Sequence, residues 1–309
     1  MVADKNLKGH IALFVAYIIF GLNVPIAKNV LIHEEVCSAL ALTFYRFCGA
    51  GILFWLASLF TRRESVPVRD LFLLFGASFC GIFISQLTFV VGLADTSPID
   101  ASVIATTSPI MTMILAAFFL KEPVTWKKAT GVFIGLLGAL LLIFSGNITE
   151  QRQSNHIGNL LCLLGTFSFA IYLSAFKRLI QKYSPITIMK WMFLFATLCS
   201  LPFCLNDVMA VHYSGISVEI YLQILYVVVL ASFLSYLLVP VGQKFLRPTI
   251  VSMYNYMQPV TSSFVAVVLG MDRFGFVKGS ATVLIVLGVY IVIKSKSYAQ
   301  LKAESNHSR

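Results

Sequence analysis

Residues 91–139 read VGLADTSPIDASVIATTSPIMTMILAAFFLKEPVTWKKATGVFIGLLGA, and residues 241–289 read VGQKFLRPTIVSMYNYMQPVTSSFVAVVLGMDRFGFVKGSATVLIVLGV. The second stretch repeats the first without a gap at an offset of 150 positions. The prolines of each copy are 11 residues apart, as Pro98 and Pro109 in one and as Pro248 and Pro259 in the other. Other identical pairs are Val91/Val241, Gly92/Gly242, Ser102/Ser252, Ala116/Ala266, Lys128/Lys278, Leu137/Leu287 and Gly138/Gly288. Because self-similarity at a fixed offset indicates a duplicated architecture, the sequence predicts two similar halves.

The composition places both halves in a lipid bilayer. Hydrophobic residues make up 58% of the chain and charged residues 12%, whereas soluble domains carry about 25% charged residues. The apolar residues form runs close to the roughly 20 residues that a membrane-spanning helix needs. We therefore predict an all-α polytopic membrane protein with ten transmembrane helices. The predicted segments are Ile11–Ala27, Val36–Phe60, Leu71–Ala94, Ile99–Leu120, Trp126–Phe144, Ile157–Phe176, Ile186–Leu205, Ile220–Val241, Thr249–Gly270 and Phe274–Ile293.

The Lys and Arg residues alternate between the two sides of these segments. Seventeen of them lie at the termini and in every second loop, and only four, Lys28, Arg152, Arg273 and Lys278, lie on the opposite side. Connections rich in Lys and Arg stay in the cytoplasm. We therefore expect an integral protein of the plasma (inner) membrane with both termini in the cytoplasm. The alternation also supports the count of ten spans, because one missed helix would disrupt it.

The longest polar connection, residues 145–156, divides the chain into two halves of five helices. We place the first repeat at residues 1–146 and the second, with a short cytoplasmic tail, at residues 147–309. Because five is an odd number, the second half enters the membrane upside down relative to the first. Inverted repeats of this kind are a recurring plan of secondary transporters, which bind their substrate near the middle of the bilayer.

Pro109 and Pro259 lie at the middle of the fourth and ninth segments. A proline inside a helix removes one backbone hydrogen bond, and the carbonyl that it frees needs a partner or a water-filled cavity. Polar side chains cluster just before both prolines. Since two symmetry-related kinks with unlike polar groups suit an asymmetric ligand, we predict that the kinks belong to a gated substrate site; local satisfaction of each kink is the alternative. The predicted contacts are Gln86, Asn255, Tyr256 and Gln258.

Arg46 is the one charged residue deep within an apolar segment. Ionisable residues inside a membrane are usually functional, so Arg46 is a candidate for recognising a carboxylate or a phosphate. Bonding to backbone carbonyls is the structural alternative. Every Asp, Glu and His lies in a loop or at the edge of a segment. The sequence therefore shows no proton relay across the membrane, and Asp95 and Asp100 are the nearest candidates for proton coupling.

The fifth segment carries glycines at Gly131, Gly135 and Gly138. Small residues four positions apart let two membrane helices approach closely. We expect this close packing within the fold rather than in a dimer.

These features resemble those of a known family of carriers. The ten spans, the doubled block and the pattern Pro98…Pro109…Leu120-Lys121-Glu122 before a glycine-rich helix resemble the EamA family of the drug/metabolite transporter superfamily. Gly21-Leu22-Asn23 followed by Lys28, and Arg46 in the second segment, are similar to the pattern of the family's first repeat. The resemblance covers about residues 9–296. It implies a ten-helix, inverted-repeat carrier from a family that mostly exports amino acids and other small metabolites.

The resemblance also implies where the substrate binds. The central cavity of the family would be lined here by segments that hold Asn23, Gln86, Thr107, Tyr172, Tyr236 and Asn255. The second copy departs from the pattern, because Met271-Asp272-Arg273 replaces Lys121-Glu122-Pro123. We therefore do not expect the two gates to work identically.

We expect a secondary transporter that exports amino acids or other small metabolites across the plasma membrane by alternating access. A sugar-phosphate or nucleotide-sugar antiporter is the alternative within transport, but only Arg46 and Lys190 offer the positive charge that such a substrate needs. An intramembrane enzyme is the alternative from another class, yet neither HExxH nor GxSG occurs. We expect no catalytic residue, no metal and no cofactor. The expected partners are a small-molecule substrate and the lipid bilayer, with no nucleic acid, and the expected state is a monomer or homodimer.

Overall fold

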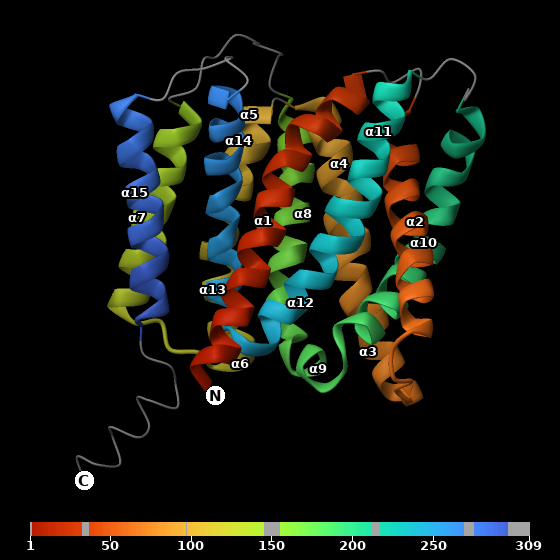
Figure 1. The fold of residues 1–309 in the computed structure, drawn as a ribbon, viewed down its shortest axis with the longest axis horizontal. Helices are drawn as coiled ribbons and strands as arrows, with labels where there is room; N and C mark the ends of the chain where they lie inside the picture. The colour runs from red at the N-terminus through yellow and green to blue at the C-terminus, as the bar shows by residue number, and fades with distance from the viewer. Residues whose placement is uncertain are drawn as a thin grey trace.

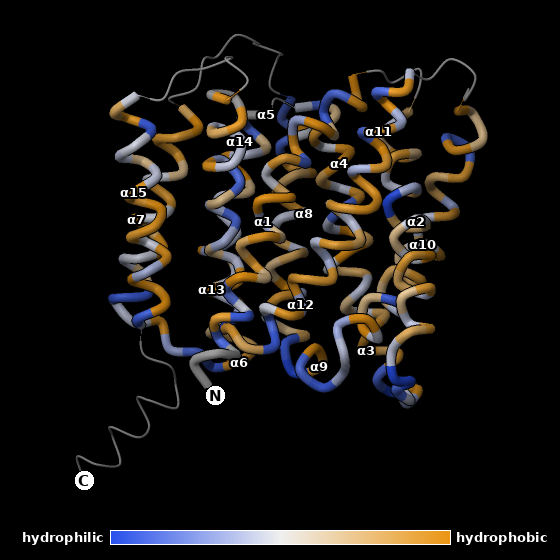
Figure 2. The backbone as a smooth tube through the Cα atoms, viewed as in Figure 1, coloured by the Kyte–Doolittle hydropathy of each residue, from blue (hydrophilic) through white to orange (hydrophobic). Residues whose placement is uncertain are grey.

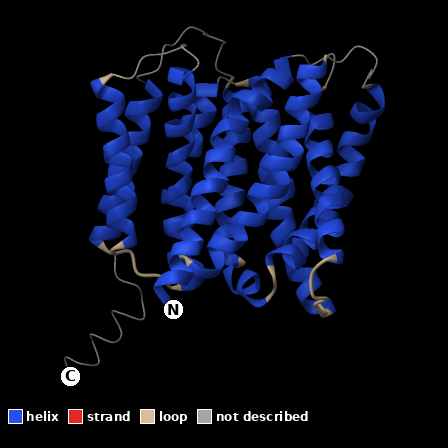
Figure 3. Ribbon diagram, in the orientation of Figure 1, coloured by secondary structure: helices blue, strands red, loops and turns tan. Residues whose placement is uncertain are grey.

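The computed structural model describes residues 2–32, 37–96, 98–144, 155–211, 217–268 and 275–295. All regular structure within these ranges is helical (Figure 3). Nine helical stretches in the described part of the chain are long and apolar enough to cross a bilayer. Hydrophobic residues dominate the middle of the bundle, and hydrophilic ones gather toward its two ends (Figure 2). The predicted all-α polytopic membrane protein is therefore confirmed.

The helices follow the ten predicted segments, but the first helix begins nine residues before and ends five residues after the predicted Ile11–Ala27. Six segments are single helices, α1 (Val2–Ile32), α2 (Ala39–Leu59), α7 (Trp126–Phe144), α8 (His156–Ala175), α10 (Pro185–Ala210) and α15 (Phe276–Ile293), and the short α9 (Lys177–Lys182) follows α8. The third segment consists of α3 (Val68–Ser78), the π-helix η1 (Phe79–Ile84) and α4 (Ser85–Asp95), and the eighth of α11 (Val218–Tyr226), the π-helix η3 (Val227–Leu234) and α12 (Ser235–Phe245). The fourth consists of α5 (Pro98–Ala105) and α6 (Ser108–Leu120), and the ninth of α13 (Pro248–Met253), the 3₁₀ turn η4 (Tyr254–Tyr256) and α14 (Met257–Val268). Residues 269–270, the predicted end of the ninth segment, lie outside the described residues.

The two halves pack as an inverted repeat, in which matching helices exchange roles. Helix α1 packs against α12 and α14 of the second half, and its counterpart α8 packs against α4 and α6 of the first. The pairs α7/α15 and α2/α10 join matching helices and stand at opposite edges of the bundle (Figure 1). The centre of the bundle is therefore formed by α1, α8 and the segments that they contact.

The third and eighth segments both change to a π-helix near their middle, at η1 and η3. Serine side chains accompany the wider turns of η3, because Ser232 Oγ donates to the Val227 carbonyl at 2.8 Å and Ser235 Oγ to the Leu230 carbonyl at 3.1 Å. Each of these bonds reaches five residues back, which is the spacing of the π-helix. The extra residue turns the side chains that follow, and Gln86 and Tyr236 come directly after the two stretches.

Helices α7 and α15 meet through their glycines. A Cβ atom on Gly131 would lie 2.8 Å from the Gly288 carbonyl oxygen, and one on Gly138 would lie 2.7 Å from the carbonyl oxygen of Ala281. Only glycine permits so close an approach of two backbones, and van der Waals packing is the main attraction between helices in lipid. The prediction that Gly131 and its neighbours pack within the fold is confirmed.

Candidate functional site

A cavity of about 100 Å³ lies between helices of both halves. Its walls are Tyr17, Phe20, Asn23, Val24, Ala27, Arg46, Ser85, Gln86, Phe89, Val90, Leu93, Ala105, Ser108, Gly165, Thr166, Phe169, Tyr236, Asn255 and Gln258. Most of these residues lie near the middle of their segments. Ala27 and Leu93 lie closer to the ends of α1 and α4, so the cavity extends from the middle of the bundle toward the end opposite the N-terminus.

The two interrupted segments both border this cavity. In a regular helix the N–H of residue 109 would bond to the carbonyl of Ala105, and that of residue 259 to the carbonyl of Asn255, but proline has no N–H. Ala105 and Asn255 both line the cavity and are 150 positions apart. The helices are interrupted at residues 106–107 and at η4. The duplicated prolines therefore place one helix interruption of each half beside the same cavity.

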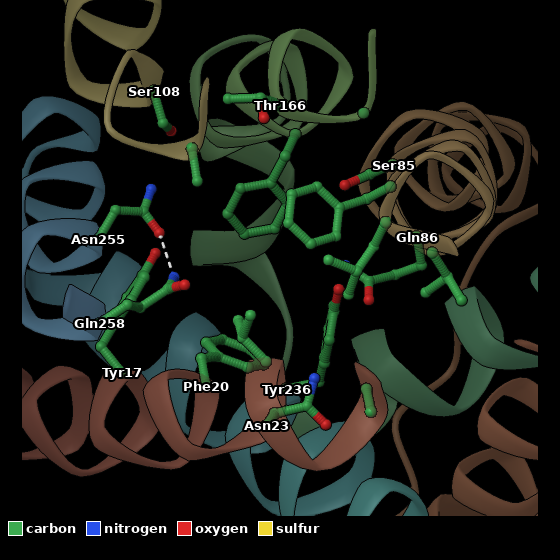
Figure 4. A pocket seen from close by; sticks show the side chains of 18 of the residues that line it. Tyr17, Phe20, Asn23, Ser85, Gln86, Ser108, Thr166, Tyr236, Asn255 and Gln258 are labelled. Atoms are coloured by element: carbon green, nitrogen blue, oxygen red, sulfur yellow. Dashed lines mark hydrogen bonds between the residues drawn. The ribbon is translucent and has the colours of Figure 1, made fainter. Parts of the chain in front are cut away.

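Polar side chains stand on two sides of the cavity, with aromatic rings between them (Figure 4). On one side Gln258 Nε2 donates to Asn255 Oδ1 at 2.9 Å. On the other side the Gln86 side chain interacts with the Tyr236 hydroxyl. Phe20 packs edge-on against Tyr236, with ring centroids 5.7 Å apart. The site can therefore hold a solute that combines polar groups with an apolar part.

Three buried polar atoms of the cavity wall have no hydrogen-bond partner within the described chain. They are the Tyr17 hydroxyl, Asn23 Oδ1 and Ser108 Oγ. Leaving a buried polar group unpaired costs about 1–3 kcal/mol. Tyr17 and Asn23 belong to the first helix of the first half, and Ser108 begins α6. A polar solute or water in the cavity would satisfy these atoms, which makes the cavity the candidate binding site.

Arg46 brings the one formal charge among the residues that line the cavity. It is 3% exposed, and its Nε donates to Ser232 Oγ at 3.0 Å. No carboxylate among the described residues forms an ion pair with it. A guanidinium in this setting can bind an anion through its remaining N–H groups.

The structure brings together six of the residues predicted to bind substrate or recognise charge. Those that line the cavity are Asn23, Arg46, Gln86, Tyr236, Asn255 and Gln258. Thr107, Tyr172 and Tyr256 lie outside its wall. Pro109 and Pro259 lie beside it, next to the cavity residues Ser108 and Gln258. Asp95 and Asp100, the candidates for proton coupling, are also outside the wall.

The three residues outside the wall have structural surroundings. Thr107 Oγ1 donates to the Ile104 carbonyl at 2.6 Å. At this residue the structural alternative therefore holds, in which a polar side chain bonds to the backbone of its own kink. The Tyr256 hydroxyl donates to the Val132 carbonyl at 3.1 Å and so ties η4 to α7. Tyr172 packs over Gly81, where a Cβ would lie 2.5 Å from the tyrosine Cγ. Polar character alone did not distinguish these positions from the cavity wall.

Several residues of the wall were not among the predicted contacts. Tyr17 and Phe20 lie on the same face of α1 as Asn23 and Val24, since residues three, four and seven apart share one face of a helix. This spacing would have identified both aromatic residues once Asn23 was chosen. Ser85, Ser108 and Thr166 carry no such signal, because single hydroxyls are common throughout membrane helices.

Two lysines close the ends of the helices around the cavity in matching ways. Lys28 caps the last carbonyls of α4, with its Nζ 3.1 Å from the oxygen of Thr96. Lys177 caps the last carbonyls of α12, with its Nζ 3.0 Å from the oxygen of Gln243 and a second bond to the oxygen of Leu246. A cation is favoured at the C-terminus of a helix, where carbonyls lack partners. The same contact thus recurs at opposite ends of the bundle, once in each half.

Further charges surround Lys177 at the end of the bundle that holds the N-terminus and α9 (Figure 1). Burial lowers the pKa of Lys177 to about 8; the charge of Glu122 opposes this shift, and the charge of Arg247 reinforces it. Glu122 Oε2 lies 2.8 Å from Nζ of the buried Lys128. Arg247 Nη2 donates to the Ser295 carbonyl at 2.9 Å. This end is therefore held by charged groups in close contact with backbone carbonyls.

Comparison with known proteins gives the fold a context. The sequence model of the EamA-like transporter family matches residues 7–144 and again residues 156–294. The uncharacterized transporter YetK of Bacillus subtilis is 23% identical over 307 residues, covering 96% of this chain and 90% of that protein. An uncharacterized transporter of Archaeoglobus fulgidus is 25% identical over 259 residues, covering 84% of this chain and 90% of that protein. A solved structure, described only as a crystal structure of a protein, superposes with a TM-score of 0.70 at 18% identity and covers 94% of this chain and 97% of its own.

Proposed function

Because the chain belongs to the EamA-like transporter family, we propose that it is a secondary transporter that exports amino acids or other small metabolites by alternating access. Its relatives are named as transporters without a substrate. The cavity and the charges around it support the choice of substrate class.

The observation that carries the proposal is the set of unpaired polar atoms in the cavity wall. The Tyr17 hydroxyl, Asn23 Oδ1 and Ser108 Oγ lack partners in the described chain. These groups replace the hydration shell of a polar solute as it leaves water. The residues that line the cavity belong to both halves, so movement of one half relative to the other changes the binding site and its access together.

The size of the cavity favours small metabolites over nucleotide sugars. Its volume is about 100 Å³, and an apolar cavity of about 150 Å³ holds one benzene molecule. A solute with few non-hydrogen atoms fits this space, whereas a nucleotide sugar has several times that size. Phe20, Phe89 and Phe169 supply the apolar part of the wall.

Matching contacts in the two halves support alternating access. Lys28 and Lys177 make equivalent capping contacts at opposite ends of the bundle. Both contacts are formed in this structure, and we propose that breaking one of them accompanies the opening of the bundle at that end. Solute binding then shifts the balance between the two states only if it contacts them differently.

The distribution of Lys and Arg along the chain supports a membrane location and an orientation for the protein. We propose that it resides in the plasma membrane as a monomer or homodimer, with both termini in the cytoplasm. The support is the excess of Lys and Arg in alternate connections. No nucleic-acid partner and no cofactor are proposed.

Uptake into proteoliposomes tests the function. Purified protein is reconstituted, and uptake of radiolabelled amino acids is measured with and without a pH gradient and with unlabelled amino acid inside. We expect saturable uptake that falls by about tenfold or more in Asn255→Ala and Gln86→Ala, because each loses a polar contact that a bound solute needs. The matched control is Gln181→Ala, at an exposed site outside the cavity, which should retain wild-type uptake.

Two outcomes would count against this proposal. Equal uptake by wild-type protein and both cavity variants would place the substrate elsewhere. Absence of uptake for every solute, with folded protein confirmed by gel filtration, would remove the support for small metabolites and lead to sugar phosphates and lipophilic drugs as the next panel.

A further inference from the structure

Arg46 is a buried charged residue with a single hydrogen-bond partner in the described chain. Its side chain is almost fully buried and lines the cavity. Transfer of a guanidinium out of water is costly unless an anion or several hydrogen bonds compensate for it. The described residues supply one hydrogen bond, from Nε to Ser232 Oγ.

The N–H groups of Arg46 that remain without a partner in the described chain have the geometry to bind a carboxylate. A guanidinium carries five N–H donors, and two of its edges match the two oxygens of a carboxylate. Ser232 engages the Nε–H, so the two terminal amino groups remain for a ligand. Tyr236 lines the same cavity, and its hydroxyl carries no formal charge that could balance the guanidinium. The described part of the chain places no Asp or Glu beside the guanidinium.

On the premise of the proposed transport function, we infer that the substrate carries a carboxylate group and that this group binds to Arg46. The site takes a single negative charge, because Arg46 is the only charged residue in the described wall. A phosphate dianion would leave one of its two charges without a counter-charge in the described wall. The small volume of the cavity also limits the remainder of the solute.

The rest of the wall suits an amino acid or a related carboxylic acid. Figure 4 shows Asn23 beside Tyr236, on the same side of the cavity as Gln86. Asn23 Oδ1 has no partner within the described chain and can accept a hydrogen bond from an amino group. The aromatic rings of Phe20 and Phe169 are available to an apolar side chain.

The test compares acids with their uncharged or cationic counterparts of nearly equal size. The probes are radiolabelled L-alanine, L-serine, L-threonine and L-lactate with the four corresponding amides. L-Alaninol, which has a hydroxymethyl group in place of the carboxylate of alanine, is a further control. Uptake into proteoliposomes is measured for wild-type protein, Arg46→Gln and Arg46→Lys. The wild type should prefer at least one acid over its amide by about tenfold or more, since charge-assisted hydrogen bonds are about twice as strong as neutral ones. The preference should disappear in Arg46→Gln and persist, with a higher KM, in Arg46→Lys.

Two additional variants separate recognition from folding. Thr166→Ala changes a neutral wall residue and should alter the uptake of acid and amide by the same factor. Ser232→Ala removes the partner of Nε and should weaken the preference for acids even where the Arg46 variants do not fold. Melting temperatures of the detergent-solubilised variants, with and without each probe, give a binding readout that needs no transport.

The outcomes distinguish this inference from the proposed function. An unchanged ratio of acid to amide uptake in folded Arg46→Gln would overturn the inference. Uptake of amides or L-alaninol without uptake of acids would overturn it while leaving the transport function intact. Uptake and binding of none of the probes would contradict both.

Discussion

Replacement of Gly288 by alanine tests the contact that joins the two halves at one edge of the bundle. A Cβ atom at this position would lie 2.5 Å from Gly135 N and 2.6 Å from Gly131 O. Ordinary Cβ contacts begin at 3.4 Å, so helix α15 would have to move away from α7 by roughly 0.9 Å. These neighbours are backbone atoms of another helix and cannot turn aside.

The cost of this movement follows from the packing of α7 against α15. A gap of about 0.5–1 Å forfeits a quarter to a half of the dispersion energy of each contact. Extra methyl groups in well-packed interiors typically cost about 1–3 kcal/mol. Lipid tails are as apolar as the helix side chains, so burying apolar surface between two helices in a bilayer gains little. The association of such helices therefore depends on close van der Waals packing. We expect Gly288→Ala to destabilise the protein by about 1–3 kcal/mol.

The matched control is Gly51→Ala on α2, which faces α10. There a Cβ would lie 3.7 Å from Phe193 Cβ and 3.8 Å from Thr197 Oγ1, both ordinary contacts. Alanine in a helix is favoured over glycine by about 1 kcal/mol. Thermal unfolding of the detergent-solubilised protein measures both variants, and a change of about 1 kcal/mol shifts the melting temperature by roughly 2–4 °C in chains of about 150–250 residues.

A fall in the melting temperature for Gly288→Ala, without a fall for Gly51→Ala, is the expected result. Equal melting temperatures for Gly288→Ala and the wild type would refute the reasoning, because they would mean that α7 and α15 do not pack as closely as the glycines require. A similar fall in both variants would show that loss of any helix glycine is destabilising, independent of the contact.

Three other predictions concern the anchoring contacts around the site. Glu122→Gln leaves the fully buried Lys128 without its counter-charge, so we expect about 3–5 kcal/mol of destabilisation in thermal unfolding; Lys127→Met, which removes an exposed charge from the same turn of α7, should leave the melting temperature unchanged. Tyr256→Phe removes the hydroxyl that bonds to the Val132 carbonyl and should lower the free energy of unfolding by about 1 kcal/mol without altering the KM of uptake. A changed KM would indicate that Tyr256 contacts the substrate. The pKa of Lys177 is lowered from 10.5 to about 8, so the folded state binds this proton more weakly than the unfolded state; stability attributable to Lys177 should therefore rise between about pH 8 and 10.5. Melting temperatures across this range should increase for the wild type relative to Lys177→Gln, and parallel curves for the two proteins would contradict the assignment.

Composition and repetition were enough to predict the class of fold. Long apolar segments have one stable solution in a bilayer, the helix, because every backbone hydrogen bond must be made internally. The alignment of residues 91–139 with 241–289 predicted the duplication, and the odd number of helices per half predicted its inversion. These inferences need only local hydropathy and counting, so they required no knowledge of how the helices pack.

The candidate site was predictable where a residue combined two signals. Asn255 and Gln258 are polar and adjoin a mid-helix proline, and Gln86 is a large amide within an apolar segment; all three line the cavity. Thr107 and Tyr256 carry similar signals but bond to neighbouring carbonyls instead. The hydrogen-bond partner of a polar side chain depends on which atoms of neighbouring helices it faces, and the sequence alone does not give these neighbours.

The sequence by itself therefore determined a duplicated, inverted helical membrane protein with one charge deep in an apolar segment and two proline-interrupted helices. Only the tertiary structure decided that these features meet in one cavity. The π-helical stretches before Gln86 and Tyr236 rotate the following turns, and their hydrogen bonds depend on contacts with other helices as well as on the local chain. Rotation of a helix about its axis is set by long-range packing, because hydropathy is nearly uniform around helices that face lipid on one side and apolar neighbours on the other.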